Sequence, residues 1–201
     1  MPLETTKKML IEAYHNSYAV GAFNVNNMEM MQAVIDAGVE ENAPVILQFS
    51  IGAIRYAGLS LISGMVKGAA SQVHIPVALH FDHGATYDQN MACIKNGFTS
   101  LMYDGSLLPL EKNILETSRI CIEAHKKQIP VEAELGRVPH EGATLEEINN
   151  LLANPAQAKY FVEKTNVDSL AVAIGSVHAQ CKQPTALDFE RLKKIKKEIP
   201  Q

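Results

Sequence analysis

The sequence predicts an α/β protein in which helices cover a parallel sheet. Short apolar runs rich in β-branched residues alternate along the chain with amphipathic helical stretches. The runs are apolar on both faces, which is the pattern of strands buried between helices. Six such runs are the expected strands, at residues 19–25, 45–50, 77–81, 100–103, 130–135 and 169–174.

The stretches between these runs carry signals for helix starts. Thr86 with Gln89 fits a capping box, in which the two side chains satisfy backbone N–H groups at the beginning of a helix. Asn154 followed by Pro155 fits a cap and a first helical position, and Asp188 is expected to cap the last helix. The predicted helix starts therefore fall outside the predicted strands.

Two segments lie outside the regular alternation. Residues 5–14 are predicted to form a helix before the first strand, where it can plug the bottom of a barrel. The stretch 136–154 is longer than an ordinary connection between a strand and a helix, and it contains Gly136, Pro139 and Gly142. We expect it to be a mobile loop beside an active site.

The composition limits the kind of protein. With 201 residues and 47% hydrophobic side chains, the chain can form one core, so residues 1–201 are expected to be a single domain. The net charge of −4 and the absence of a basic patch argue against nucleic acid, and no apolar run approaches the roughly 20 residues that cross a membrane. The N-terminus lacks the pattern of a signal peptide, so a cytoplasmic protein is expected. Cys93, Cys121 and Cys181 are odd in number, far apart in the sequence and in no C-x-x-C spacing, which argues against a disulfide framework and a cysteine zinc site and favours reduced thiols, with Cys93 and Cys121 buried.

Polar side chains gather where four of the predicted strands end. The segments are His80-Phe81-Asp82-His83-Gly84, Asp104-Gly105-Ser106, Glu132-Ala133-Glu134-Leu135-Gly136 and Gly175-Ser176-Val177-His178. Ligands of parallel α/β folds bind beyond the carboxyl ends of the strands. Histidines with nearby carboxylates are typical of a divalent metal, for which zinc is the first choice. The alternative is that His83 and His178 bond only to backbone groups.

These motifs resemble one known family. Gly-Ala-Phe-Asn-Val-Asn at 21–26, Ala-Leu-His-Phe-Asp-His-Gly at 78–84, Ser-Leu-Met-Tyr-Asp-Gly-Ser at 100–106, Glu-Ala-Glu-Leu-Gly at 132–136 and Gly-Ser-Val-His at 175–178 occur in order along the chain. Together they resemble the class II, zinc-dependent fructose- or tagatose-bisphosphate aldolases. The resemblance implies a TIM (β/α)8 barrel, of which this chain would hold about six βα units.

The resemblance also implies a metal site. His83 and His178 would be catalytic zinc ligands, with nitrogens on the order of 3 to 4 Å apart. Asp104 and Glu134 would be ligands of an alternative, more buried metal position, with room for a second cation, divalent or monovalent. Asp82 would be the proton donor and acceptor at the carbon–carbon bond.

The same resemblance implies the substrate contacts and the reaction. Asn24, Ser50 and Lys182 would contact the substrate, and Glu141 would be the acid of the loop that handles the enediolate proton. The reaction would be reversible cleavage of a ketose 1,6-bisphosphate into dihydroxyacetone phosphate and glyceraldehyde 3-phosphate through a zinc-stabilised enediolate. The family also predicts a homodimer or a higher homo-oligomer.

The sequence departs from the family pattern in several places. Family members continue past position 201 with two more strands, which supply a third zinc-binding histidine and most of the phosphate site. Ala179 replaces a usual glycine, and Ile51 stands where a glutamate is common. We therefore expect impaired activity, and the alternative function is that of a non-catalytic truncated barrel that acts as a partner or regulatory subunit.

Overall fold

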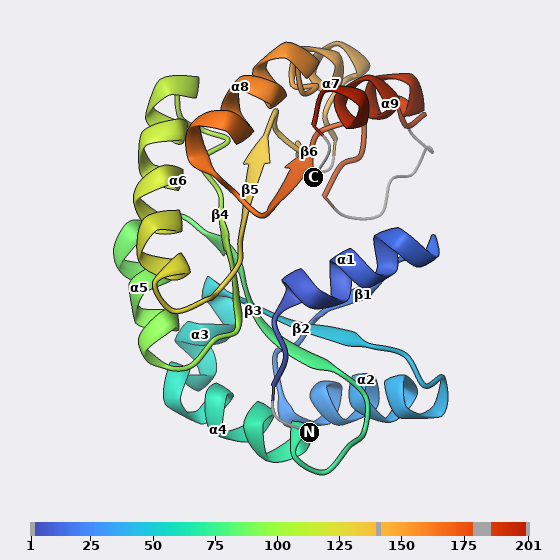
Figure 1. Cartoon of the computed structure of the whole chain (residues 1–201), viewed down its shortest axis with the longest axis vertical. Coiled ribbons are helices and arrows are strands. Elements are labelled where there is room, and N and C mark those ends of the chain that lie inside the picture. Colours follow the sequence, from blue (N-terminus) through green and yellow to red (C-terminus); the bar gives the residue numbers. More distant parts are fainter. Residues whose placement is uncertain (1–2, 140–141, 179–185, 200–201) are drawn as a thin grey trace. The chain divides into compact units, whose positions relative to one another are not determined.

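The computed structural model describes residues 3–139, 142–178 and 186–199, in which helices and strands alternate along the chain (Figure 1). The chain divides into two compact units, one of Met1–Tyr103 with Ile122–Val131 and one of Asp104–Cys121 with Glu132–Gln201. The elements are α1 (Thr6–Asn16), β1 (Gly21–Asn24), α2 (Met28–Glu40), β2 (Val45–Ser50), α3 (Ile51–Ala57), α4 (Leu59–Ala70), β3 (Val77–Gly84), α5 (Tyr87–Lys95), β4 (Ser100–Tyr103), α6 (Leu110–His125), β5 (Val131–Leu135), α7 (Leu145–Asn150), α8 (Pro155–Thr165), β6 (Ser169–Val172) and α9 (Phe189–Glu198).

The strands of each unit are parallel and follow the order of the sequence. In the first unit β1 pairs with β2, β2 with β3 and β3 with β4. The N–H of Leu101 in β4 also donates to the carbonyl of Pro130 at 3.2 Å, so the chain leading into β5 continues the same pattern. In the second unit β5 pairs with β6. The α/β fold class with parallel strands is therefore confirmed.

Side chains of the first unit alternate between two faces of the sheet. The helices α2 and α4 lie on one face, whereas α1 lies on the opposite one (Figure 1). Met9 of α1 packs with Ile46 and Ala78 in a buried cluster, and Val20 packs against it. Because strand residues two positions apart share a face, the side chains of even-numbered residues in β2 and β3 lie on the side of α1. The first helix, which was predicted from the sequence, thus covers the apolar part of the inner face.

Strand β3 is longer than predicted and changes register within the motif of residues 80–84. The apolar run predicted a strand that ends at residue 81, but the strand continues to Gly84. The pairing with β4 shifts between Phe81 and Gly84, and His83 has a φ angle of 51°. A bulge of this kind redirects side chains beside functional sites, and the left-handed conformation costs about 1–3 kcal/mol in a residue other than glycine.

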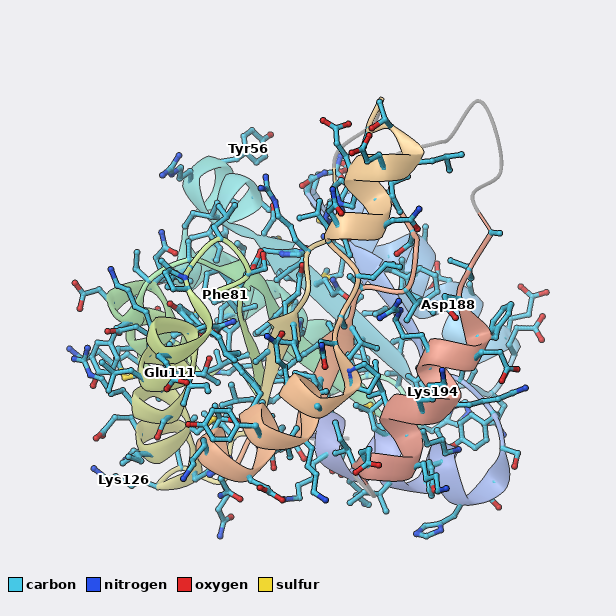
Figure 2. All side chains as sticks on the ribbon, turned by 90° about the horizontal axis from the view of Figure 1, so that it is seen from above. Tyr56, Phe81, Glu111, Lys126, Asp188 and Lys194 are labelled. Atoms are coloured by element: carbon cyan, nitrogen blue, oxygen red, sulfur yellow. The ribbon has the colours of Figure 1, made fainter. Side chains whose placement is uncertain are left out.

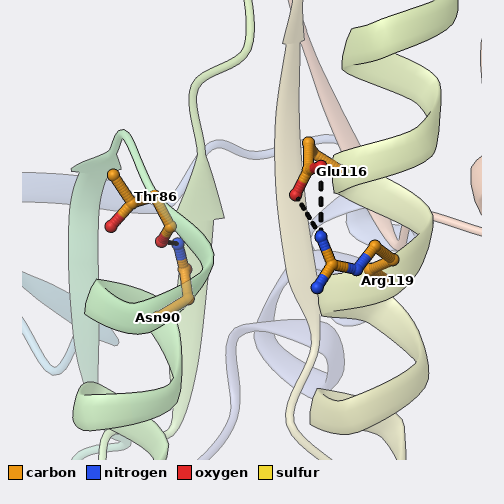
Figure 3. A network of polar contacts seen from close by, with 4 residues as sticks. All are labelled: Thr86, Asn90, Glu116 and Arg119. Carbon is orange, nitrogen blue, oxygen red and sulfur yellow. Dashed lines mark hydrogen bonds and ion pairs between the residues drawn. The ribbon is translucent and has the colours of Figure 1, made fainter.

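The predicted helix starts are confirmed, but the capping box expected at Thr86 forms only in part. Thr86 accepts a hydrogen bond from the N–H of Gln89 at 3.3 Å, whereas the side chain of Gln89 accepts from the N–H of Ala85 at 3.0 Å rather than from that of Thr86. Asn90 donates its side-chain N–H to the carbonyl of Thr86 at 3.0 Å (Figure 3). Asn154 caps α8 with Pro155 in its first turn. Asp188 caps α9 by accepting from the N–H of Arg191 at 2.8 Å.

In the second unit, the long connection after β5 contains a helix of its own. Thr144 and Glu147 form a capping box at the start of α7, because each side chain accepts a hydrogen bond from the backbone of the other. Gly136 has a φ of 75°, and a Cβ atom there would lie 2.7 Å from the carbonyl oxygen of Leu151. The connection is thus partly regular, and only a residue without a side chain fits at its start. On α6, Glu116 and Arg119 form an exposed ion pair at 3.0 Å (Figure 3).

The outer face of β3 packs against aromatic side chains. The rings of Phe81 and Phe98 meet edge to face, with centroids 6.4 Å apart, and both side chains are fully buried.

By contrast Tyr56 projects from α3 and is 79% exposed (Figure 2). Within the described ranges, no helix combines the length and apolar character that spanning a membrane requires.

We predict that Gly84→Ala destabilises the protein by about 1–3 kcal/mol, because the added methyl group would overpack the bulge. Its carbon would lie 2.8 Å from the carbonyl oxygen of Met102 and against the ring of Phe81. Urea unfolding of the purified chain measures this change. The control is Gly64→Ala in α4, where nothing lies within 4 Å of the new methyl group and where alanine should stabilise the helix by up to about 1 kcal/mol. Equal changes at both glycines would contradict the prediction.

Candidate functional site

Asp82 and Asn24 form a direct contact at the carboxyl ends of their strands. Asn24 is the last residue of β1, and its side-chain N–H donates to Oδ2 of Asp82 at 2.6 Å. Asp82 is only 8% exposed, so its carboxylate has lost most of its water. The hydrogen bond from the amide offsets part of that loss and fixes the orientation of the carboxylate.

The bulge in β3 places His83 next to the same carboxylate. Nε2 of His83 lies 3.9 Å from Oδ1 of Asp82, which is too long for a hydrogen bond but close enough for an electrostatic interaction. The side chain of His83 is 35% exposed, whereas that of Asp82 is 11% exposed. One oxygen of Asp82 therefore accepts from Asn24, and the other lies on the side of an accessible imidazole.

Ser50 ends the neighbouring strand at the same level. It pairs in register with Asp82, and its hydroxyl caps α3 by accepting from the N–H of Ala53 at 3.4 Å. The helix α3 begins directly after Ser50, at Ile51, so its N-terminus, which carries a partial positive charge, lies at this end of the sheet. The predicted residues Asn24, Ser50, Asp82 and His83 are thus placed on three adjacent strand ends of the first unit.

A row of polar side chains crosses the sheet at the level of His80, two residues before Asp82 in β3. The strand registers align Asn24 with Gln48, Gln48 with His80, and His80 with Ser100. His80 is 3% exposed, and its Nδ1 lies 2.8 Å from the hydroxyl of Ser100. Ile46 and Ala78, which precede this row on the same face, belong to the apolar cluster that α1 covers, so a polar layer lies between this cluster and Asp82.

Burial controls the charge of His80. Loss of water lowers the pKa of its imidazole from 6.5 to about 4, against the opposing attraction of Asp82, and the proximity of His83 lowers it further. His80 is therefore neutral at physiological pH. A neutral imidazole keeps one nitrogen as a donor and the other as an acceptor.

The second unit contains two carboxylates close to each other. One oxygen of Asp104 lies within 4.8 Å of one oxygen of Glu134. Asp104 accepts from the N–H of Ser106 at 3.0 Å, and Glu134 accepts from the N–H of Val138 at 3.2 Å. Glu134 is 3% exposed. Like charges at this separation repel each other unless a proton or a cation offsets them, so the pair fits a metal with oxygen ligands.

The remaining predicted residues are only partly described. His178 follows β6, is exposed, and donates its backbone N–H to the carbonyl of Pro139 at 2.9 Å. It belongs to the second unit and His83 to the first, so the short distance predicted between their nitrogens stays a prediction. Glu141 and Lys182 lie outside the described residues.

The sequence interpretation missed the buried partners of the site. His80 and Ser100 lie inside the motifs at 78–84 and 100–106, and Thr6 lies in the predicted first helix, but the sequence indicated no role for any of the three. The signal for His80 was its position two residues before Asp82, which puts both side chains on one face of a strand. Thr6 and Ser100 carry no such signal. The two described cysteines are buried as expected, and burial raises the pKa of Cys93 and of Cys121 to about 12.

Comparison with known proteins places this fold and motif set in a family. Residues 4–200 match the family described as class II fructose-bisphosphate aldolase. The chain is 43% identical over 198 residues to the fructose-bisphosphate aldolase of Staphylococcus aureus strain Mu50. This match covers 97% of this chain and 69% of that protein. It is 43% identical over 195 residues to the fructose-bisphosphate aldolase of Helicobacter pylori, of which it covers 64%.

A solved structure agrees with these matches. The YdjI aldolase of Escherichia coli K12 superimposes with a TM-score of 0.86 and 35% identity over 98% of this chain and 69% of that one. The fold class, a (β/α)8-barrel fold with about six of its eight βα units in this chain, is therefore confirmed. The chain belongs to the class II fructose-bisphosphate aldolase family.

We predict that His80 makes the protein sensitive to mild acid. The unfolded chain binds a proton at this histidine below about pH 6.5, whereas the folded chain does so only below about pH 4, so stability falls as the pH decreases through this window. Urea unfolding measures the free energy of unfolding at pH 7.5 and at pH 4.5. The decrease in this free energy between the two pH values should be greater in the wild type than in His80→Gln by on the order of 2–3 kcal/mol. Equal losses in the two proteins would show that His80 is protonated in the fold.

Proposed function

We propose that this protein is a zinc-dependent aldolase that cleaves a ketose 1,6-bisphosphate reversibly into dihydroxyacetone phosphate and glyceraldehyde 3-phosphate. The observation that carries the proposal is the contact between Asn24 and Asp82, because it fixes a buried carboxylate at the strand ends next to the accessible His83. Membership of the family supports the same reaction class.

Zinc fits the donors that the chain offers. Zinc in proteins takes imidazole nitrogen and carboxylate oxygen, and we propose His83 and His178 as its ligands. We propose Asp104 and Glu134 as ligands of an alternative position for zinc or for a second cation, since their oxygens already lie close to each other. Zinc would supply a Lewis acid that stabilises negative charge on the substrate oxygens during cleavage.

Asp82 is proposed to move the proton at the bond that breaks. In the cleavage direction, its carboxylate accepts the proton of the C4 hydroxyl while the bond between C3 and C4 breaks, and the electron pair of that bond passes into the dihydroxyacetone phosphate half. In the reverse direction the same group returns the proton. The hydrogen bond from Asn24 holds one oxygen of Asp82, so the second oxygen is left for this transfer.

The other predicted residues complete the proposal. Asn24 and Ser50 would contact the sugar at the strand ends, and Lys182 would bind a phosphate group. Glu141 would supply the proton that converts the enediolate into dihydroxyacetone phosphate. We further propose that the protein acts in the cytoplasm as a homodimer or a higher homo-oligomer, on either fructose or tagatose bisphosphate.

We predict that His83→Ala and His178→Ala each weaken zinc binding by more than about tenfold, since each would remove a ligand. Competition with a chelating dye, followed during zinc titration of the purified chain, measures the affinity. His74→Ala is the matched control, because this exposed histidine bonds to Asn42 and precedes β3, whereas His83 lies near the other end of that strand. Native mass spectra separate a zinc-loaded oligomer from a metal-free monomer, and the latter would favour the non-catalytic partner subunit instead.

We predict that Asp82→Ala lowers turnover by about 10²-fold or more and leaves zinc content near normal, because the proton-transferring group is lost and the ligands remain. The coupled assay for triose phosphate release is run on this chain and on a version extended by the last third of the Staphylococcus aureus relative. Asp36→Ala, an exposed aspartate on α2, is the control. Loss of zinc would make Asp82 structural, and unchanged turnover would remove it from the mechanism.

A further inference from the structure

A buried chain of three polar side chains links the first helix to the catalytic strand. The hydroxyl of Thr6 in α1 lies 2.8 Å from that of Ser100 in β4, and the latter lies 2.8 Å from Nδ1 of His80 in β3. The three residues are 5%, 1% and 3% exposed. All belong to the first unit, and bulk water does not compete for these hydrogen bonds.

The order of donors in this chain follows from counting hydrogen atoms. Within the described part of the protein, the hydroxyl of Thr6 bonds only to Ser100, and that of Ser100 bonds only to Thr6 and His80. If Ser100 donated to Thr6, the hydroxyl hydrogen of Thr6 would be buried without an acceptor, which costs about 1–3 kcal/mol. Both hydrogens are used only if Thr6 donates to Ser100 and Ser100 donates to His80.

This order fixes the tautomer of His80. Nδ1 accepts from Ser100, so in the neutral ring the hydrogen must be on Nε2. His80 and Asp82 lie two residues apart in the part of β3 that pairs regularly with β2, so they share the inner face. In the Nε2–H tautomer the nitrogen that does not contact Ser100 carries a hydrogen, so that edge of the ring is positive and attracts a carboxylate on the same face. In the Nδ1–H tautomer the same nitrogen carries a lone pair, which repels a carboxylate.

We propose that Ser100, oriented by Thr6, locks His80 as its neutral Nε2–H tautomer, and that His80 in this form is a positioning residue for Asp82. The role toward Asp82 rests on the function proposed above, whereas the tautomer does not. The low pKa of His80 agrees with an imidazole that stays neutral in its buried place. The first helix would then contribute to the geometry of a site to which it donates no catalytic group.

Nitrogen-15 NMR of the zinc-free chain, labelled at histidine, tests the tautomer directly. We expect the signals of His80 to report Nε2–H in the wild type and in Thr6→Ser, which keeps the hydroxyl. Ser100→Ala removes the donor to Nδ1 and should shift the ring toward a mixture of tautomers. Ser63→Ala is the matched control, since it deletes another buried serine hydroxyl that donates to the carbonyl of Asn96 and leaves His80 untouched. An Nδ1–H tautomer in the wild type would overturn the proposal.

Kinetics of the extended protein test the effect on Asp82. We expect Ser100→Ala to lower kcat by about tenfold with less than about a twofold change in KM, because a displaced proton-transferring group affects chemistry more than binding. Ser63→Ala should change both constants by less than about twofold. Equal effects of the two variants on kcat would overturn the positioning role. Unchanged turnover in Asp82→Ala would overturn the proposed function, and the NMR result would still decide the tautomer.

Discussion

The arrangement of the first unit depends on the two-residue period of strand β3. The strand is covered on both faces, so alternate residues must satisfy opposite surroundings. Leu79 and Phe81 are fully buried on the side of the outer helices, whereas His80 and Asp82 lie on the inner side. A slip of one residue would exchange the two sets and bury a carboxylate among aromatic rings. The same alternation therefore specifies both the core and the placement of His80 and Asp82.

Much of this arrangement could be predicted from the sequence because the signals are local. Apolar runs bounded by caps gave five of the six strands within a few residues of their observed ends, and Asn154 and Asp188 cap helices as expected. The exception is β3, whose polar end looks like a loop. Its extension to Gly84 depends on pairing with β4 across a register shift, which no local pattern encodes.

The polar support of the site could not be predicted for a related reason. In the sequence, Thr6 is an ordinary residue in the first turn of a predicted helix, and Ser100 is a small residue in a predicted strand. Their role exists only because the two side chains meet, and the chain between them spans 94 positions. The acids Asp104 and Glu134 were found more easily, because each occupies a strand end where a buried charge is unexpected.

The bond between Thr6 and Ser100 has a consequence for folding. Contacts between residues so distant in sequence are entropically costly to close, so we expect this one to form after the local helices. The hydrogen bonds that hold His80 in its buried place need Ser100 of β4 and, through it, Thr6 of α1. During synthesis, the inner layer of the first unit can therefore be completed only after residue 100 has left the ribosome. Until then, Thr6 of the N-terminal helix lacks Ser100, which is synthesised 94 residues later.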